Sequence, residues 1–378
     1  MSQVTYLDHN ATTPIYPEVA EVVGEVMRES GSNPSSIYGS GRRARKRVES
    51  ARGCIANLVN AKTDEVIFTG SGSEADNMAI MGSSRNRVLV GETEHSAVLK
   101  TALLRTKKSQ LLPVNKDGII ELDALDERLA ESEDSSLVCV MAANNETGVL
   151  QPVRDVADIA HAHGALVLCD AVQAVGKIHV DFAAWDVDYM ALSAHKIGGP
   201  QGVGALVRRE GVPFNSFVTG GGQERGARAG TENVPGIVGY GVAAQIVKDT
   251  WQTNATRVEG FRDDLERQVL ELSPCSEIFS VNAPRLPNTS NFSLPEVQSD
   301  TQVINLDLAD IAVSAGSACS AGKVDLSHVL AAMGIASEIA STAIRVSFGW
   351  NSKVEDVHAF IAIWQKMIRG SSRQESAA

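Results

Sequence analysis

Polar side chains that can take part in acid–base chemistry follow several short apolar runs of the chain, at the points where those runs end. They belong to His95, Asn145, Asp170, Gln173, Ser193, His195 and Lys196. Each has an ordinary interpretation by itself, because an Asp after a strand is usually a helix cap and a lone His or Lys usually lies on the surface. An imidazole, an amide, a carboxylate and an amine that meet at one place would instead form a reactive site.

The elements that carry these residues alternate along the chain. Apolar runs typical of buried strands occupy 65–69, 87–90, 137–141, 165–169, 187–192 and 203–207. Helical patterns lie at 17–27, 40–58, 74–82, 96–105, 122–130 and 153–163. This alternation predicts a largely parallel sheet with helices on both faces. Ligands of such sheets bind beyond the carboxyl ends of the strands, so we expect the polar side chains to meet there.

A glycine- and serine-rich turn, GSGSEADN at 70–77, follows the first strand and opens a helix. Its backbone N–H groups, near Gly72, and the Ser73 hydroxyl could hold a phosphate, because helix N-termini bind anions. The motif is weak evidence alone, since many such turns are only tight turns. An Asp and a Lys beside a phosphate site fit pyridoxal phosphate, in which the Lys forms a Schiff base and the Asp pairs with the pyridinium nitrogen.

Length and charge limit the class of protein. A chain of 378 residues suggests about two domains. After residue 207 the pattern changes to a segment rich in glycine and charge at 219–236, a long helix near 236–273 and a smaller α+β unit. The net charge of −12 argues against nucleic acid or an anionic membrane surface as the main partner.

The sequence also predicts the compartment. No secretory signal is visible at the N-terminus, and no stretch approaches the roughly 18 apolar residues of a membrane helix. The five cysteines are widely spread and form no CxxC pair, so neither a disulfide framework nor a zinc site is expected. Reduced thiols in a cytoplasmic protein fit this usage best.

The chain resembles a known family from residue 6 to about 350. The matching stretches include YLDHNATTP at 6–14, NPSS at 33–36, NNETGVLQPV at 144–153, CDAVQAVGK at 169–177, SAHKIGGPQGVGAL at 193–206, GGGQERGARAGTENV at 220–234, SAGSACSAGKVDLSHVL at 314–330 and IRVSFG at 344–349. They resemble cysteine desulfurases of the NifS/IscS type, among the class V aminotransferases of pyridoxal-phosphate fold type I. The resemblance implies an α/β fold with a large domain at 14–255, built on a mainly parallel seven-stranded sheet. Residues 1–13 and 256–378 would form a smaller α+β domain.

The resemblance also implies roles for single residues. Lys196 would carry the cofactor, Asp170 and Gln173 would bind its ring nitrogen and ring hydroxyl, and His95 would stack on the ring and move protons. The phosphate would be held by Gly72, Ser73, Ser193 and His195, and by Thr231 of the neighbouring subunit in a homodimer. Arg345 would pair with the substrate carboxylate through its guanidinium fork, and Asn33 and Asn145 would help to hold this carboxylate and the cofactor ring.

Cys319 is the nucleophile that the resemblance implies. It would take sulfur from L-cysteine as a persulfide, release L-alanine and pass the sulfur to an acceptor, often an iron–sulfur scaffold protein. The resemblance implies no metal site of the chain's own, and at most a transient iron–sulfur ligand at Cys319 shared with a scaffold. For the other four cysteines we expect small buried residues. The sequence departs from the family at Ser73, Tyr38 and Leu326, where Thr, His and Pro are common, which leaves partner choice and loop behaviour open.

We consider three alternative functions. A selenocysteine lyase or group II desulfurase would carry a motif of the form RxGHHCA, which is absent. An aminotransferase would have no use for Cys319. A catalytically silent subunit that only docks scaffold proteins would not need Lys196, Asp170, His95, Arg345 and Cys319 together.

Overall fold

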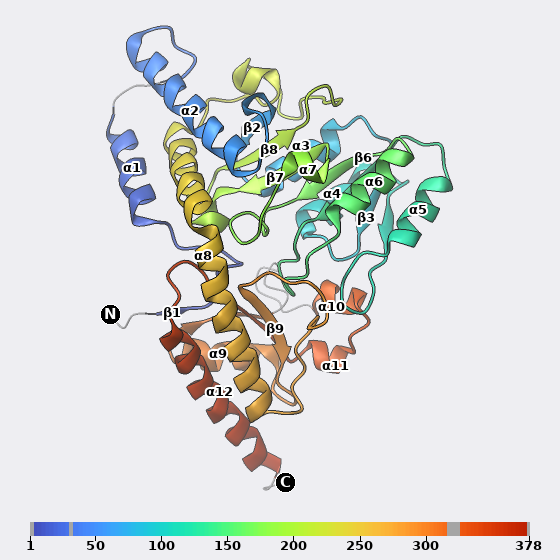
Figure 1. The fold of residues 1–378 in the computed structure, drawn as a ribbon, viewed down its shortest axis with the longest axis vertical. Helices are drawn as coiled ribbons and strands as arrows, with labels where there is room; N and C mark the ends of the chain where they lie inside the picture. Colours follow the sequence, from blue (N-terminus) through green and yellow to red (C-terminus); the bar gives the residue numbers. More distant parts are fainter. Residues whose placement is uncertain (1–3, 30–32, 316–325, 376–378) are drawn as a thin grey trace.

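The computed structural model describes residues 4–29, 33–315 and 326–375. Its upper part in Figure 1 is built on a seven-stranded sheet with the order β2-β8-β7-β6-β5-β3-β4. The strands are β2 (Val66–Thr69), β3 (Arg87–Gly91), β4 (Gln110–Leu112), β5 (Ser136–Met141), β6 (Leu166–Asp170), β7 (Tyr189–Ser193) and β8 (Gly204–Arg208). Only β8 runs against its neighbours, so the predicted, mainly parallel sheet is confirmed.

Helices cover both faces of this sheet, as the alternating pattern predicted. One face packs against α3 (Gly72–Gly82) and α4 (Ser96–Arg105). The other packs against α1 (Pro17–Arg28), α2 (Gly39–Leu58), α5 (Leu122–Ala130), α6 (Val153–Ala162), the short α7 (Phe182–Trp185) and the first half of α8 (Val234–Leu272). Helix α6 illustrates why these helices pack against the sheet, because its buried residues recur at helical spacing on one side: Val153, Val156, Ala157 and Ala160.

The lower part has its own sheets and core. A parallel pair joins β1 (Thr5–Tyr6) to β10 (Ile311–Ala312), and an antiparallel sheet orders β11 (Ser314–Ala315), β12 (Ala343–Ser347) and β9 (Thr289–Ser293). Helices α9 (Ser299–Asp307), α10 (His328–Ala332), α11 (Ser337–Ala340) and α12 (Val354–Glu375) complete it. Its core stacks Phe360 on Trp364, with Phe292 edge-on to both rings.

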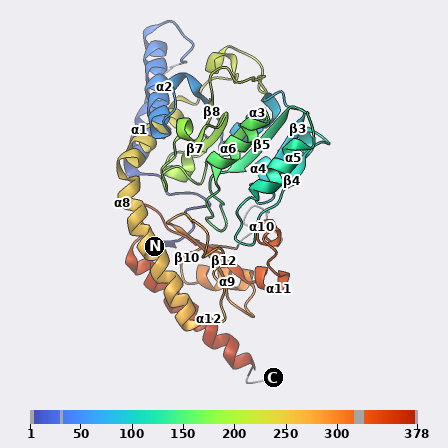
Figure 2. The same ribbon diagram turned by 45° about the vertical axis from the view of Figure 1, so that its right-hand side comes forward.

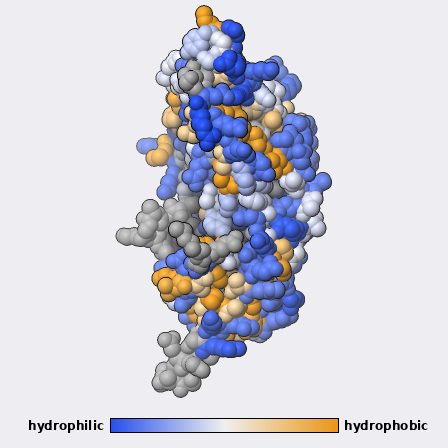
Figure 3. Space-filling view, turned by 90° about the vertical axis from the view of Figure 1, so that its left-hand side faces the viewer, coloured by the Kyte–Doolittle hydropathy of each residue, from blue (hydrophilic) through white to orange (hydrophobic). Residues whose placement is uncertain are grey.

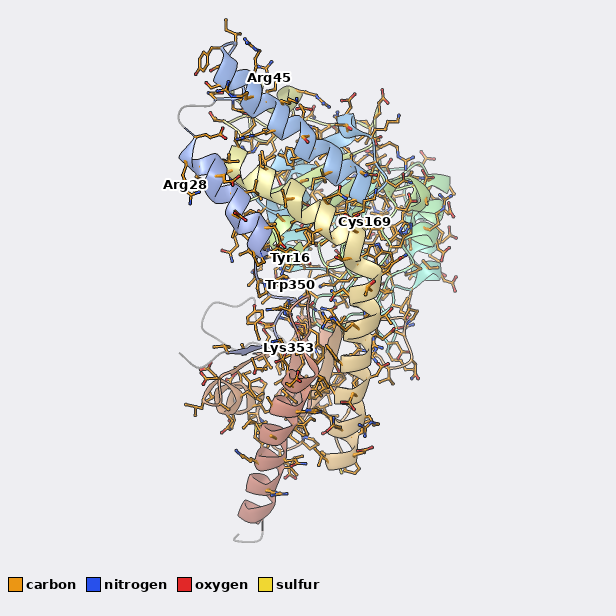
Figure 4. All side chains as sticks on the ribbon, turned by 60° about the vertical axis from the view of Figure 1, so that its left-hand side comes forward. Tyr16, Arg28, Arg45, Cys169, Trp350 and Lys353 are labelled. Atoms are coloured by element: carbon orange, nitrogen blue, oxygen red, sulfur yellow. The ribbon has the colours of Figure 1, made fainter. Side chains whose placement is uncertain are left out.

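Helix α8 joins the two parts. Its 39 residues run from the upper helix layer down beside α12, and both ribbon views show this course (Figures 1 and 2). At the junction, the ring of Tyr16 lies 4.7 Å from that of Trp350, whose indole N–H donates to the Pro14 carbonyl (Figure 4). We retain the division into 14–255 and 1–13 with 256–378 as a proposal, with its boundary inside α8.

The strands and helices predicted before residue 208 agree closely with the observed ones, but β4 and α7 were not predicted, and the elements of the smaller part were predicted only as an α+β unit. Strand β4 was not predicted, because its three residues are too few to show a pattern. The face shown in Figure 3 is mostly hydrophilic, with smaller hydrophobic patches. Within the described ranges, no helix combines the length and the apolar character needed to cross a bilayer.

The fold predicts opposite effects for two glycines. A Cβ at Gly204 in β8 would lie 2.6 Å from the backbone carbon of Ser71, where α3 begins. Gly204→Ala should therefore destabilise the protein by about 1–3 kcal/mol, as overpacking does. A Cβ at Gly53 in α2 would meet nothing within 4 Å, and Gly53→Ala should stabilise by roughly 0.5–1 kcal/mol. Urea unfolding midpoints measure both, and shifts in the same direction would contradict this packing.

Candidate active site

A cavity of about 300 Å³ lies at the carboxyl edge of the large sheet. Its polar lining comes from Asn10, Ser71, Gly72, Ser73, Asp76, His95, Asn145, Asp170, Gln173, Ser193, His195, Lys196 and Arg345. The sheet topology explains the gathering, because β5, β6 and β7 are parallel neighbours and their carboxyl ends open on one edge. The polar residues predicted at the strand ends therefore meet in one place.

Two predicted residues are not part of this gathering, and a third lies outside the described residues. Asn33 is exposed, its amide oxygen accepts the N–H of Ser35, and it does not line the cavity. Thr231 is also exposed and away from the cavity of its own chain. Cys319 lies outside the described residues. The roles expected for these residues stay predictions.

The amine of Lys196 is held by the main chain of the N-terminal segment. Lys196 lies in a short 3₁₀ turn, Ala194–Ile197, directly after β7. Its Nζ donates to the carbonyl oxygens of Asn10 at 2.5 Å and Ala11 at 2.8 Å. These two carbonyl groups fix the position of the amine at the wall of the cavity.

Asp170 belongs to a group of three buried carboxyls. Its Oδ1 accepts the N–H of Val172 at 2.9 Å; burial raises the pKa of Asp170, while His95 and Lys196 oppose the rise. Burial and the charge of Asp170 raise the pKa of Asp76 and of Glu94 well above their usual values. Burial and the charge of Asp170 thus favour the protonated forms of Asp76 and Glu94, while the charge of Lys196 favours the ionised form of Asp170.

The imidazole of His95 caps helix α4. Its Nδ1 accepts the backbone N–H of Ala97 at 3.2 Å, so Nδ1 carries no proton. Burial lowers the pKa of His95, with Lys196 adding to the effect, so the ring is neutral. Its proton then resides on Nε2, and His95 can donate a hydrogen bond from that atom.

The start of α3 forms the predicted anion cradle. Ser71 caps the helix by accepting the N–H of Glu74, and within the described residues no acceptor is found for the N–H groups of Gly72 and Ser73. A Cβ at Gly72 would lie 2.8 Å from Cγ2 of Val172, so only glycine leaves this approach open. Beside it, Nδ1 of His195 lies 3.1 Å from the Thr12 hydroxyl, and burial lowers the pKa of His195 to about 4.

Arg345 reaches the cavity from β12 in the lower part. Its Nη1 donates to the Asn145 carbonyl at 2.8 Å, and its Nη2 pairs with Asp8 at 2.6 Å and with the Ser314 hydroxyl at 3.1 Å. Its Nε is buried and has no acceptor among the described residues. That N–H remains available to an incoming carboxylate.

Sequence reasoning missed Asp8, Asn10 and Lys177. All three stand in stretches that match the family, but nothing in the sequence shows that the N-terminal segment crosses the edge of the sheet. The sequence feature that could have identified them is their position inside these matching stretches.

The expectation for the four other cysteines is right in part. Cys139 and Cys169 are buried in strands, and Cys169 is labelled in Figure 4. Cys54 is half-buried, and the prediction for Cys275 is wrong because this thiol is exposed. Cys275 follows the end of α8 in a turn at the surface, where no second layer covers it.

Comparison with known proteins fits this architecture. The model of the aminotransferase class-V family matches residues 5–360. The chain is 37% identical over 380 residues to "Cysteine desulfurase IscS" of Dictyoglomus turgidum, covering 97% of this chain and 95% of that protein. The chain belongs to the cysteine desulfurase family.

Solved structures of this family share the fold. The NifS-like protein from Rickettsia africae superposes with a TM-score of 0.90 at 34% identity, covering 97% of this chain and all of that one. The structure of "SspA in complex with cysteine" gives a TM-score of 0.78 at 28% identity over 91% of this chain and 98% of that one. The expected fold, a mainly parallel sheet with a smaller α+β part, is confirmed.

Class V aminotransferases, including the cysteine desulfurases, use pyridoxal phosphate, and the cavity fits this group. The unpaired N–H groups at the start of α3 suit a phosphate, and the volume of about 300 Å³ is that of a small-ligand pocket. An amine and a carboxyl stand in the same cavity for the aldehyde and the ring nitrogen.

Glu146, beside the cavity, predicts a pH-dependent stability. It accepts from the Ser327 hydroxyl at 2.5 Å, and burial raises its pKa from 4.5 to about 7, against the opposing effects of Ser327 and Arg345. The folded state then holds a proton that the unfolded state loses between pH 4.5 and pH 7. The Glu146 contribution to stability therefore falls as the pH rises through this window.

Glu146→Gln should remove this fall. Relative to wild type, the variant should gain roughly 2–3 kcal/mol between pH 4.5 and pH 8, measured by urea unfolding. Glu25→Gln, on the exposed face of α1, is the matched control and should follow wild type. A Glu146→Gln curve parallel to that of wild type would contradict the raised pKa.

Proposed function

We propose that this protein converts L-cysteine to L-alanine and retains the sulfur as a persulfide on Cys319. The observation that carries the proposal is the presence of the Lys196 amine, the Asp170 carboxyl and the Arg345 guanidinium in one cavity. An amine and a carboxyl suit pyridoxal phosphate, and a guanidinium suits the carboxylate of an amino acid. The complex of the related SspA protein with cysteine supports this substrate.

Pyridoxal phosphate, when bound, supplies an electron sink for negative charge at the substrate α-carbon. Asp170 would hold the ring nitrogen, Gln173 the ring hydroxyl, and Gly72, Ser73, Ser193 and His195 the phosphate. Lys196 would attach the cofactor covalently. Burial of Asp170 beside the cationic groups strengthens its attraction to a protonated ring nitrogen.

The chain's own groups would then bind and move protons. Arg345 binds the substrate carboxylate through its unpaired Nε, with Asn145 beside it. The Lys196 amine, once released from the cofactor, takes the α-proton at Nζ, because a neutral amine is a stronger base than the neutral imidazole of His95. His95 contributes its Nε2 proton as a hydrogen-bond donor.

Sulfur transfer needs a thiol nucleophile, and no cysteine is found among the described residues that line the cavity. The Cys319 thiolate would attack the substrate sulfur and form an S–S bond, while the Cβ–Sγ bond breaks and its electron pair stays with the carbon. Protonation of that carbon gives the methyl group of alanine. The sulfur atom of the substrate thus becomes the outer atom of the persulfide on Cys319.

The proposal extends to partners and location. We propose a cytoplasmic homodimer in which Thr231 reaches the phosphate of the neighbouring subunit, which accords with its exposure and its absence from the cavity of its own chain. The acceptor of the persulfide sulfur would be an iron–sulfur scaffold or another sulfur-acceptor protein. "IscS" in the name of the Dictyoglomus turgidum relative supports the first choice.

Replacing Cys319 tests the sulfur step. Cys319→Ala should keep the cofactor, since no proposed cofactor contact involves this thiol, but alanine formation from cysteine should fall to background because the sulfur has no acceptor. Cys275→Ala, which removes an exposed thiol away from the cavity, is the matched control and should retain full activity. Alanine is measured by chromatography, with persulfide by mass spectrometry.

Two outcomes would decide against this role of Cys319. A Cys319→Ala protein that releases alanine and sulfide at near wild-type rate would point to a β-lyase. Transfer of the amino group from cysteine to an oxo acid, without loss of sulfur, would point to an aminotransferase.

A further inference from the structure

Lys177 stands behind the cavity and has no place in the mechanism described so far. It follows Gln173 by four residues in the turns after β6. Its side chain is partly buried, and its amine donates to two amide oxygens but has no carboxylate within ion-pair distance among the described residues. A buried amine without a carboxylate partner is costly, so its retention needs a reason.

The contacts of this amine define the orientation of Gln173. Nζ of Lys177 donates to Oε1 of Gln173 at 2.5 Å. Because an amine in this position donates, Oε1 is the acceptor end of the amide and Nε2 is the donor end. Nε2 gives one N–H to the Asn10 carbonyl at 2.9 Å, which leaves its second N–H for the cavity that Gln173 lines.

The same amine also holds Asn10. Nζ of Lys177 donates to Oδ1 of Asn10 at 2.8 Å, and Asn288 donates to that oxygen at 3.2 Å. The side-chain amide of Asn10 donates in turn to the Thr289 hydroxyl at 2.9 Å. The carbonyl of Asn10 is the group that accepts from Lys196, so one amine fixes the supports of two cavity residues.

We propose that Lys177 is a positioning residue that fixes the side-chain amides of Gln173 and Asn10. Gln173 then presents an N–H group to the hydroxyl oxygen on the cofactor ring. The inference rests on the proposed function, since it concerns the binding of pyridoxal phosphate. Lys177 touches neither substrate nor cofactor and acts through Gln173.

A positioning role and a structural role of Lys177 predict different effects of its replacement on the stability of the protein. Burial lowers the pKa of Lys177 well below its usual value, and Lys196 and Arg345 add to this effect, so the surroundings disfavour the charged form of the amine and offset its two hydrogen bonds. Replacing it by an apolar side chain of similar length removes that cost. The protein without cofactor should then be at least as stable, while cofactor binding should weaken.

Lys177→Met tests this difference. The apo-protein should unfold at the same or a higher temperature than wild type, and its Kd for pyridoxal phosphate should rise about tenfold, the effect of losing one hydrogen bond. The KM for cysteine should stay within about twofold, because the contacts of Arg345 are untouched. Lys353→Met, an exposed lysine labelled in Figure 4, is the matched control and should change neither quantity.

A double-mutant cycle identifies the route of the effect. Gln173→Ala alone should also weaken cofactor binding, and Lys177→Met should add much less in that background than in wild type, because only its contact with Asn10 remains. Additive losses, an unchanged Kd in Lys177→Met, or a lowered unfolding temperature of that variant would each overturn the inference.

The proposed function fails in a different way. Wild-type protein that does not bind pyridoxal phosphate would overturn both proposals. Wild-type protein that binds it and forms alanine, together with a Lys177→Met variant that binds it equally well, would overturn only the role of Lys177.

Discussion

The site depends on the way the protein holds one amine. Lys196 donates to the carbonyl groups of Asn10 and Ala11, which are neutral acceptors. These two carbonyl groups fix the position of the amine at the wall of the cavity, beside Asp170. The N-terminal segment reaches the cavity at the edge of the large sheet directly after β1, which pairs with β10 in the lower part.

This segment also joins the two parts of the molecule. Asp8, two residues before Asn10, pairs with Arg345 of β12, and Asn10 itself bonds to Thr289 of β9. The group proposed to bind the substrate and the group proposed to carry the cofactor are thus positioned by the same few residues. The buried carboxyls of the site add to this arrangement, because burial and the charge of Asp170 raise the pKa of Asp76 and of Glu94 and so disfavour further negative charges beside Asp170.

Much of the site could be predicted from the sequence, because its main residues stand at recognisable local positions. Asp170 and Lys196 come at or directly after the ends of apolar runs, and parallel strands bring the residues at their carboxyl ends to one edge. Asp8, Asn10 and Lys177 were missed because each has a partner far away in the chain; Asp8 and Arg345, for instance, are 337 residues apart. Strand β4 was too short to show a pattern, and the exposure of Cys275 depends on the elements that cover a turn, which no local spacing states.

The most direct test is to find where the cofactor is attached. Purified protein reconstituted with pyridoxal phosphate is reduced with borohydride, digested and mapped by mass spectrometry. We expect a pyridoxyl-phosphate adduct on Lys196 and unmodified Lys177, since Lys196 lines the cavity with Asp170 and the anion cradle and Lys177 does not. An adduct on another lysine, or none, would contradict the central role of Lys196.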